Sequence, residues 1–490
     1  MKKIIYTLLG TTCILTSCED FLSEVPTKGS NQPITELSQL EALLENTSTF
    51  VYETSNIASM VTDDYEISKE LFLAKPAQFK PANMQFYIYN EEEVAKESAD
   101  GLWSGEYKKI YNANLILNNL KNVEGSPEEK KQLQAEAHFV RAYSYWVLAN
   151  NYCLPYHEKN FSEMGLPKKL RNDYDEDLTR ISLKQLYDFI DSDLAQAALI
   201  DNRNIDKRWR LNKAAYHAFM SRYRLFRGEY ELAITEADEA LKEEKVALID
   251  FATLKPSIKP GIYTNPNDTI PYSETNDYAA YKYVNWNEFY YTRFLNYRSQ
   301  WLIPSKDLLS KYDTDNDYRF INFMMPNSNR RFSILGAKAY RYTIFDDGRY
   351  AISGPSISEV LLNKAEAATR LNANLEEAKT ALYTLQSKRI KGITRSEAND
   401  HTSLLKEILE ERRRELPFSM RFYDIRRYSV NETADDDIVV TRDFFEVTPT
   451  LVNSEKPVTY VLPVASRKYA FPINQIEIMN SRNQIQQNKY

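Results

Sequence analysis

Hydrophobic residues recur at intervals of three and four positions along most of the chain, which is the spacing of amphipathic α-helices. The spacing predicts helices over residues 34–44, 128–150, 183–199, 212–226, 230–241, 305–312, 358–371 and 374–382. A further helix after Glu91 is predicted from the positions of Trp103, Tyr107, Ile110, Asn114 and Leu117. The pattern therefore predicts a mostly helical protein.

Several predicted helices follow one another as pairs joined by short connections. Ser126, Pro127 and two acids after them form a helix start between the first pair, because they supply an N-cap, a proline at N1 and first-turn carboxylates. Ala233, Ala237 and Ala240 have the small-residue spacing that resembles a tetratricopeptide B helix. We predict an all-α fold, a tetratricopeptide-like scaffold of helical hairpins at about 91–245 and 356–416.

The helical pattern is lost in three stretches. Residues 56–86 read as a long loop, residues 246–350 as a large irregular, loop-rich subdomain, and residues 417–490 as an irregular C-terminal segment. Within the last, 438–441 and 458–461 are β-branched and predict short strands. We expect residues 34–490 to form a single domain in which helices carry the scaffold and the long loops carry function.

The first residues are typical of an exported lipoprotein. Lys2 and Lys3 precede an apolar run, which is shorter than the roughly 20 residues of a spanning helix and ends at Cys18. Leu-Thr-Ser-Cys is similar to a lipobox, so residues 1–17 are predicted to be a signal peptide, Cys18 the lipidated residue and 18–33 a tether. The alternative is an ordinary secretory signal in which Cys18 is incidental.

Composition limits the classes of function. The net charge of −7 is spread over interspersed acids and bases, which argues against a nucleic-acid partner. Of the three cysteines, Cys13 leaves with the signal and Cys18 is lipidated, so Cys153 is predicted to be a buried thiol without a disulfide partner. The chain has only 12 glycines, which argues against phosphate-binding loops. It has 35 tyrosines, which favour contact surfaces.

The common catalytic and metal-binding motifs are absent from the sequence. It has no Gly-rich phosphate loop, G-x-S-x-G, paired C-x-x-C or H-E-x-x-H, and its four histidines lie far apart. Residues 313–317 resemble the start of a calcium loop, but Tyr318 and Met324 occupy the positions of its glycine and glutamate, so a turn is predicted. Residues 435–437 are predicted to be a solvated turn. We expect no enzyme activity, no cofactor and no metal site.

Residues 410–427 concentrate arginines and glutamates. Glu410 and Arg414 have i,i+4 spacing on a predicted helix whose apolar side would be Leu405, Ile408, Leu409 and Leu416. Ion pairs that hold the C-terminal segment against the helices are favoured over an anion-binding or catalytic cluster.

Several segments together resemble the SusD/RagB family of nutrient-binding outer-membrane lipoproteins. They are residues 103–107 with Asn114, 135–142, 359–367, 410–427, 471–477 and 487–490, with Ser419, Met420 and Lys489 departing from the family pattern. The resemblance implies a receptor on the outer face of the outer membrane, which captures oligosaccharides for a SusC-like TonB-dependent transporter. An oligopeptide ligand is the main alternative, and a periplasmic scaffold or a surface glycosidase are further ones.

Aromatic residues crowd into residues 278–297. The predicted ligand contacts are Tyr281, Tyr283, Trp286, Tyr290, Tyr291 and Arg293, since a sugar ring can stack on an aromatic face while polar groups bind its hydroxyls. The alternative is that about half of these side chains fill a hydrophobic cluster beneath the insertion. Asp63, Asp64 and Tyr65 are weaker candidates.

Replacement of Cys18 tests the predicted anchor. Cys18→Ala should leave the mature protein unanchored, because firm membrane attachment depends on acyl chains at about 0.8 kcal/mol per buried methylene. Membrane fractionation of cells that express the mutant measures this, with Cys153→Ala as the matched control. Mature Cys18→Ala protein that still sediments with membranes would contradict the prediction.

Overall fold

The computed structural model describes residues 34–53, 57–96, 101–173, 175–254, 286–296, 302–326, 339–344, 350–372 and 374–490. About half of the chain is helical, with 17 α-helices in this described part. They are α2 Leu37–Leu44, α3 Thr47–Phe50, α4 Ile57–Met60, α5 Lys69–Ala74, α6 Glu91–Lys96, α7 Leu102–Asn119, α8 Pro127–Tyr152, α9 Leu183–Ala197, α10 Lys213–Phe226, α11 Tyr230–Ala240, α13 Lys306–Ser310, α14 Tyr318–Phe323, α15 Ile357–Arg370, α16 Leu375–Gln386, α17 His401–Glu415, α18 Arg421–Tyr428 and α19 Gln475–Asn480.

The described strands are short and form small sheets. A three-stranded sheet has the order β1 (Tyr52–Glu53), β4 (Phe294–Asn296), β7 (Tyr350–Ile352), in which β1 and β4 are parallel. Three antiparallel pairs are β2 (Met164–Pro167) with β3 (Arg180–Ser182), β5 (Met324–Pro326) with β6 (Tyr340–Tyr342), and β8 (Val440–Val447) with β9 (Val452–Leu462). The fold is therefore mostly helical, as predicted.

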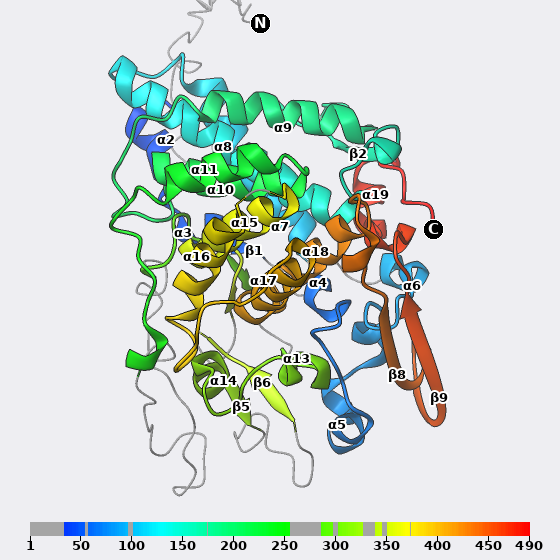
Figure 1. The fold of residues 1–490 in the computed structure, drawn as a ribbon. Helices are drawn as coiled ribbons and strands as arrows, with labels where there is room; N and C mark the ends of the chain where they lie inside the picture. Colours follow the sequence, from blue (N-terminus) through cyan, green and yellow to red (C-terminus); the bar gives the residue numbers. More distant parts are fainter. Residues whose placement is uncertain are drawn as a thin grey trace, which may run out of the picture.

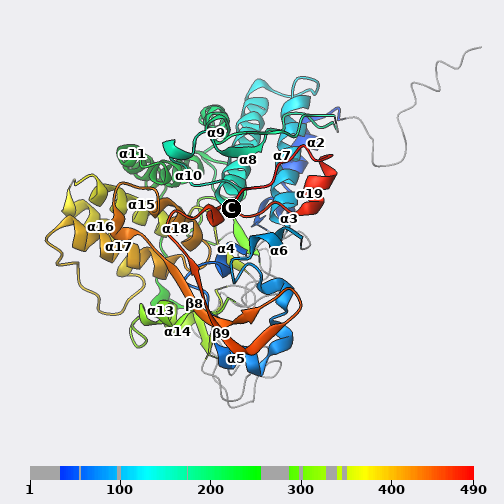
Figure 2. The same ribbon diagram turned by 90° about the vertical axis from the view of Figure 1, so that its right-hand side faces the viewer.

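The long helices pack side by side in one continuous array. α7 packs on α8, α8 on α9, α10 on α11, α11 on α15, and α15 on both α16 and α17. Figures 1 and 2 show this array above α13, α14 and the strands β5 and β6. Most helix positions agree with the sequence prediction to within a few residues. The stretch predicted as one helix after Glu91 instead contains α6 and α7, and α7 begins only at Leu102.

α8, which packs between α7 and α9, is largely buried. Its residues from Leu133 to Tyr152 are almost all buried, including Phe139 and Trp146. Its start is a capping box: Ser126 Oγ accepts from Glu129 N at 3.2 Å, and Ser126 N donates to Glu129 Oε2 at 3.1 Å. The predicted N-cap is thus confirmed.

A second hydrophobic core lies beside the core of the helical array. It joins Phe72, Phe289, Phe294, Leu302 and Phe444, which come from three stretches predicted to be irregular. Apolar residues of those stretches therefore pack mainly on one another.

Two stretches are more regular than predicted. Residues 57–84 contain α4, α5 and two 3₁₀ turns rather than a structureless loop. The C-terminal segment contains α18, α19 and the long β8–β9 hairpin, whose strands extend well beyond the predicted 438–441 and 458–461. β9 is exposed along most of its length, so alternating apolar residues, the usual signal of a strand, are scarce in it.

Buried ion pairs surround α17 and α18. Arg412 Nε lies 2.8 Å from Asp424 Oδ2, and Arg427 Nη1 lies 2.6 Å from Glu366 Oε1 on α15. The predicted ion-pair role of residues 410–427 is therefore confirmed. The predicted partner of Arg414 is wrong, since Arg414 pairs with Glu411.

The same network reaches segments far away in sequence. Arg413 Nε contacts Asp64 Oδ1 at 2.7 Å, and Arg421 Nη2 contacts Asp63 Oδ2 at 2.7 Å. Arg389 Nη2 lies 2.8 Å from Glu288 Oε2 in the insertion. Asp63 and Asp64 are thus structural ion-pair partners, which accounts for their position without a ligand.

Other local predictions have mixed outcomes. Asp313 accepts from the backbone N–H groups of Asp315 and Asn316, which is the predicted turn. Asp436 is buried and binds Arg370 Nη2 at 2.5 Å, so the prediction of a solvated turn is wrong there. Cys153 is fully buried, and burial raises the pKa of its thiol, as expected for an unreactive cysteine.

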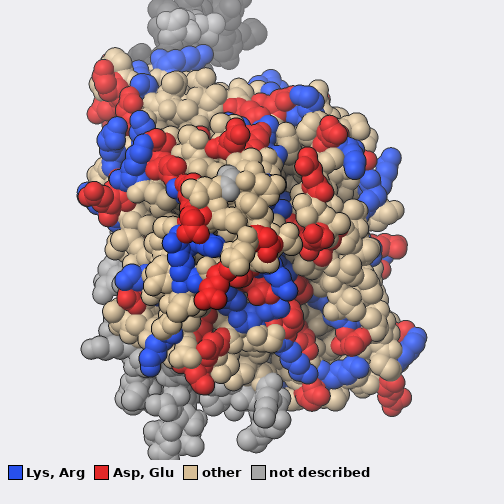
Figure 3. Space-filling view, viewed as in Figure 1, with Lys and Arg blue, Asp and Glu red and all other residues tan. Residues whose placement is uncertain are grey.

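The surface carries both signs of charge. Lysines and arginines are interspersed with aspartates and glutamates on the face drawn in Figure 3. Within the part of the chain that the structure describes, no helix combines the length and the apolar composition needed to cross a membrane.

The ion pairs make the fold sensitive to acid. Burial alone would raise the pKa of Glu366, but the guanidinium groups of Arg427 and Arg370 hold it well below its usual range. Burial would likewise raise the pKa of Asp63, but the positive charge of Arg421 lowers this pKa to about 2. A carboxyl with a depressed folded-state pKa stabilises the protein above its unfolded-state pKa of about 4, and this stability is lost as the pH falls toward 2.

We therefore expect the free energy of unfolding to fall from about pH 4 to pH 2, by up to about 1.4 kcal/mol per pH unit for each such carboxyl. Urea titrations at several pH values measure this slope. Glu366→Gln should be less stable at pH 7 and show a shallower slope, whereas Glu376→Gln, whose side chain is 63 % exposed, should match wild type. Equal slopes for all three proteins would contradict the role of Glu366.

Candidate functional site

The aromatic stretch predicted to contact ligand is only partly described. Tyr281 and Tyr283 lie outside the described residues. Trp286, Tyr290 and Tyr291 are each at most 2 % exposed. Tyr290 and Tyr291 belong to the core of the helical array, and Trp286 belongs to the second core. These three positions fit the alternative prediction of a hydrophobic cluster.

Arg293 is an internal cation in the structure. Its Nη2 lies 2.7 Å from Glu106 Oε1 and its Nε 3.3 Å from Glu53 Oε1. The guanidinium also lies over the ring of Tyr143, 4.6 Å from its centroid. Arg293 therefore ties the insertion to α7 and β1, and its described contacts are structural.

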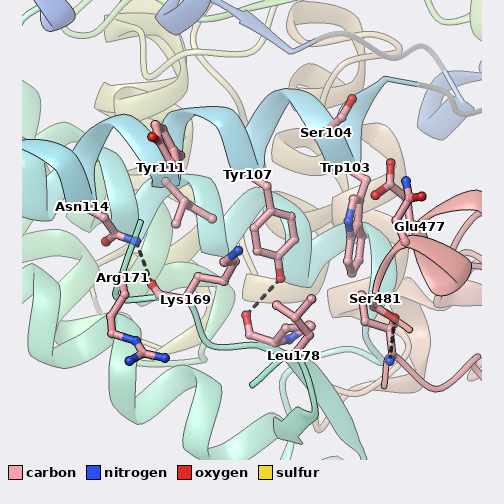
Figure 4. A pocket seen from close by; sticks show the side chains of 14 residues that line it. Trp103, Ser104, Tyr107, Tyr111, Asn114, Lys169, Arg171, Leu178, Glu477 and Ser481 are labelled. Atoms are coloured by element: carbon pink, nitrogen blue, oxygen red, sulfur yellow. Dashed lines mark hydrogen bonds between the residues drawn. The ribbon is translucent and has the colours of Figure 1, made fainter. Parts of the chain in front are cut away.

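An aromatic pocket lies instead on the outer side of α7. Trp103, Tyr107 and Tyr111 are spaced by four residues, so they follow one another along one side of the helix. Trp103 and Tyr107 have ring centroids 4.9 Å apart, and Tyr111 is 47 % exposed. Figure 4 shows Trp103 and Tyr107 side by side between α7 and Leu178.

The wall opposite α7 is held by hydrogen bonds to backbone. Tyr107 Oη donates to Pro167 O at 3.0 Å, and Asn114 Nδ2 donates to Lys169 O at 3.0 Å. The Asn114 side chain is oriented in turn by Arg141, whose Nη1 donates to Asn114 Oδ1 at 2.7 Å. These bonds fix the distance between the helix and residues 167–171.

The pocket has an apolar floor and a polar rim. Its volume is about 240 Å³, and its lining includes Ile110 and Ile485 below and Lys169, Arg171 and Glu477 around the mouth. Ligand pockets for whole drug-sized molecules measure roughly 300–1,000 Å³. This one therefore suits a single sugar ring or amino-acid side chain of a longer ligand.

Two larger hollows are less suited to stacking. One of about 620 Å³ lies between residues 154–160, 429–432 and 465–467, and no Phe, Tyr or Trp is among its described lining residues. The other, of about 470 Å³, is lined mainly by charged and hydroxyl side chains next to α17, and its Tyr428 is buried. Among the described residues, no three His, Cys, Asp or Glu side chains come together as metal ligands.

The sequence pattern placed Trp103 and Tyr107 on the core-facing side of a helix, and Trp103 is indeed only 6 % exposed, so the pattern did not indicate a pocket. The available signal was Tyr111, which continues the four-residue spacing of the aromatics while Ile110 and Asn114 follow a neighbouring line of positions. Burial then divides the helix, since Glu106, Ile110 and Ala113 are inside and Tyr111 is outside.

Two family models match the chain. A SusD-like model, described as starch-binding and associating with the outer membrane, matches residues 20–225. A model of the SusD family matches residues 348–490. Together they cover more than half of the chain, including α7, α8 and the ion-pair network of α17 and α18.

One curated relative matches part of the chain. A SusD-like protein from Formosa agariphila is 29 % identical over 170 residues, which are 30 % of this chain and 29 % of that protein. The match thus spans less than a third of the length of the curated relative.

Solved structures share the fold at low sequence identity. A SusD superfamily protein from Bacteroides thetaiotaomicron has a TM-score of 0.63 and 18 % identity, over 93 % of this chain and 100 % of the other. A SusD-like carbohydrate-binding protein from Bacteroides vulgatus has a TM-score of 0.60 and 19 % identity, over 92 % and 97 %.

The family models and the solved structures agree with the resemblance found in residues 103–107, 359–367 and 410–427. The models match the segments that build most of the helical array and the ion pairs of α17 and α18, and the structures share the arrangement of nearly the whole chain. The chain therefore belongs to the SusD family.

Proposed function

We propose that this protein is a non-catalytic receptor that captures oligosaccharides on the outer face of the outer membrane. The observation that carries the proposal is the α7 pocket, where Trp103, Tyr107 and Tyr111 meet a polar rim. A family model described as starch-binding covers this helix, which supports a glycan as the ligand class.

The pocket chemistry suits a sugar ring. The exposed face of Tyr111 offers a flat apolar surface for stacking, and Trp103 and Tyr107 give the floor its aromatic character. The side chains of Lys169, Arg171 and Glu477 reach the rim, where ring hydroxyls would accept or donate hydrogen bonds. A longer glycan would continue across the surface beside Tyr111.

The rest of the chain fits a tethered lid. We infer that residues 34–490 form one SusD-like domain built on tetratricopeptide-like helical hairpins, because α10 with α11 and α15 with α16 pack as antiparallel neighbours joined by short turns. Residues 1–17 would be removed, Cys18 acylated, and residues 18–33 would let the domain stand off the bilayer. The implied partner is a SusC-like TonB-dependent transporter, onto which the receptor would deliver its ligand.

An oligopeptide is the second candidate ligand. Lys169 and Arg171 lie on one side of Tyr107 and Trp103, and Glu477 lies on the other (Figure 4). Opposite charges of this kind would bind the ends or side chains of a peptide. The contact roles of Tyr281, Tyr283, Trp286, Tyr290, Tyr291 and Arg293 stay a prediction for either ligand.

Calorimetric titration of the purified protein against oligosaccharides and mixed oligopeptides decides between the two. A glycan receptor should bind saccharides with little dependence on salt, since stacking and neutral hydrogen bonds are not screened. Peptide binding without saccharide binding would replace the glycan by the second candidate. Release of new reducing ends during the titration would contradict the non-catalytic assignment.

Tyr111→Ala tests the pocket itself. The affinity of this variant for the best saccharide should fall about ten-fold, which is a loss of about 1.4 kcal/mol in binding free energy. Its thermal stability should change little, because the Tyr111 side chain is 47 % exposed. Tyr383→Ala is the matched control, since Tyr383 is a 38 % exposed tyrosine on α16, away from the pocket. Equal affinities of the two variants would place the ligand elsewhere.

A further inference from the structure

Arg426 differs from its neighbours in the ion-pair network. It lies on α18 and is 1 % exposed, and its Nη2 donates to Cys153 O at 2.6 Å. Its Nε and Nη1 are buried and have no acceptor among the described residues. The adjacent Arg427, in contrast, binds Glu366 at 2.6 Å and Asp424 at 2.9 Å.

The surroundings of Arg426 are aromatic rather than acidic. Its guanidinium lies over the ring of Phe422, 5.4 Å from the centroid. Burial lowers the pKa of Arg426 to about 10, and the ionisable groups that act on it are the phenols of Tyr187, Tyr423 and Tyr469 and the Cys153 thiol. All of these are neutral at pH 7, so Arg426 is a buried cation without a counter-charge from them.

Two features compensate part of this charge. Cys153 is the C-cap of α8, so Arg426 sits at the negative end of a helix of 26 residues. The ring of Phe422 adds a cation–π contact. Both act on the guanidinium without supplying an acceptor for Nε or Nη1, and an unpaired buried charge is strongly unfavourable.

A small cavity has Arg426 among its lining residues. Its volume is about 10 Å³, and Arg426, Arg227, Arg427, Tyr187, Trp146 and Phe226 are among its lining residues. Arg227 and Arg427 are already paired with carboxylates, since Arg227 Nη1 lies 2.7 Å from Asp191 Oδ1 and Arg227 Nε lies 2.8 Å from Glu229 Oε1. The space is about that of one water-sized particle, which is too small for phosphate, sulfate or a carboxylate ligand.

We propose that this cavity binds a single halide ion, chloride under natural conditions, against the free N–H groups of Arg426. Arginine only donates hydrogen bonds. The hydroxyl of Tyr469, which acts electrostatically on Arg426 from outside the cavity lining, is a further buried group without a hydrogen-bond partner among the described residues. A water molecule would bring two more hydrogens into a group of donors, whereas a halide only accepts and also neutralises the charge. The ion would join α18 to the end of α8.

Crystallography with bromide tests the site directly. Crystals of the purified full chain grown in sodium bromide should show an anomalous peak within hydrogen-bond distance of Arg426 Nε or Nη1. A peak-free site that contains ordered water would overturn the proposal. This measurement uses the wild-type protein, so it holds even where a variant fails to fold.

Thermal unfolding gives an independent test. At equal ionic strength, replacement of sodium gluconate by about 150 mM chloride should raise the melting temperature saturably, by about 2 °C for a site with a dissociation constant on the order of 10 mM. Arg426→Met should lose this response. Arg227→Met, which lines the same cavity but removes a paired arginine, should keep it. Identical melting in both salts for the wild type would contradict halide binding.

Discussion

The buried guanidinium–carboxylate pairs around α17 and α18 are the interaction on which the arrangement of the chain depends. Hydrophobic packing alone is non-directional, whereas a bidentate arginine fixes both the distance and the orientation of its partner. Arg413 and Arg421 hold the 57–65 segment through Asp64 and Asp63, and Arg389 holds the insertion through Glu288. Removal of one partner leaves an uncompensated buried charge, so these pairs define one arrangement more strictly than apolar contacts do.

Local sequence patterns were sufficient for the helical array. α8, α9, α10 and α15 each have an apolar periodicity and a polar N-cap, and both signals lie within about twenty residues of one another. The second core could not be predicted in the same way. Phe72, Phe294 and Phe444 meet there from stretches more than a hundred residues apart. α5 and β4 are too short to show a period, and the inward positions of β8 include the buried Arg442, which interrupts its apolar alternation.

The charged clusters were ambiguous for a related reason. The sequence showed that arginines and glutamates gather at 410–427, but i,i+4 spacing selects partners on the same helix. In the structure Arg412 instead pairs with Asp424, and Arg427 pairs with Glu366. Asp436 is buried and pairs with Arg370. Which arginine pairs with which carboxylate depends on distances in the folded protein, and these distances cannot be read from the spacing of residues along one helix. The same limit applies to the aromatic residues. From the sequence Trp286 and Tyr111 were equally able to contact a ligand, but in the structure Trp286 is buried and Tyr111 is exposed.

α7 connects the ion-pair network to the candidate pocket. Its inner side carries Glu106 and Lys109, which pair with each other, and Glu106 also binds Arg293 at 2.7 Å. Its outer side carries the aromatic residues, and Asn114 links that side to the buried Arg141, which in turn binds Asp193 at 2.7 Å. The helix is therefore immobilised from within by charge, while Tyr111 is exposed on its outer side and Trp103 is almost fully buried. A ligand that stacks on Tyr111 would meet a surface already held in place, so little conformational entropy would be lost from the protein on binding.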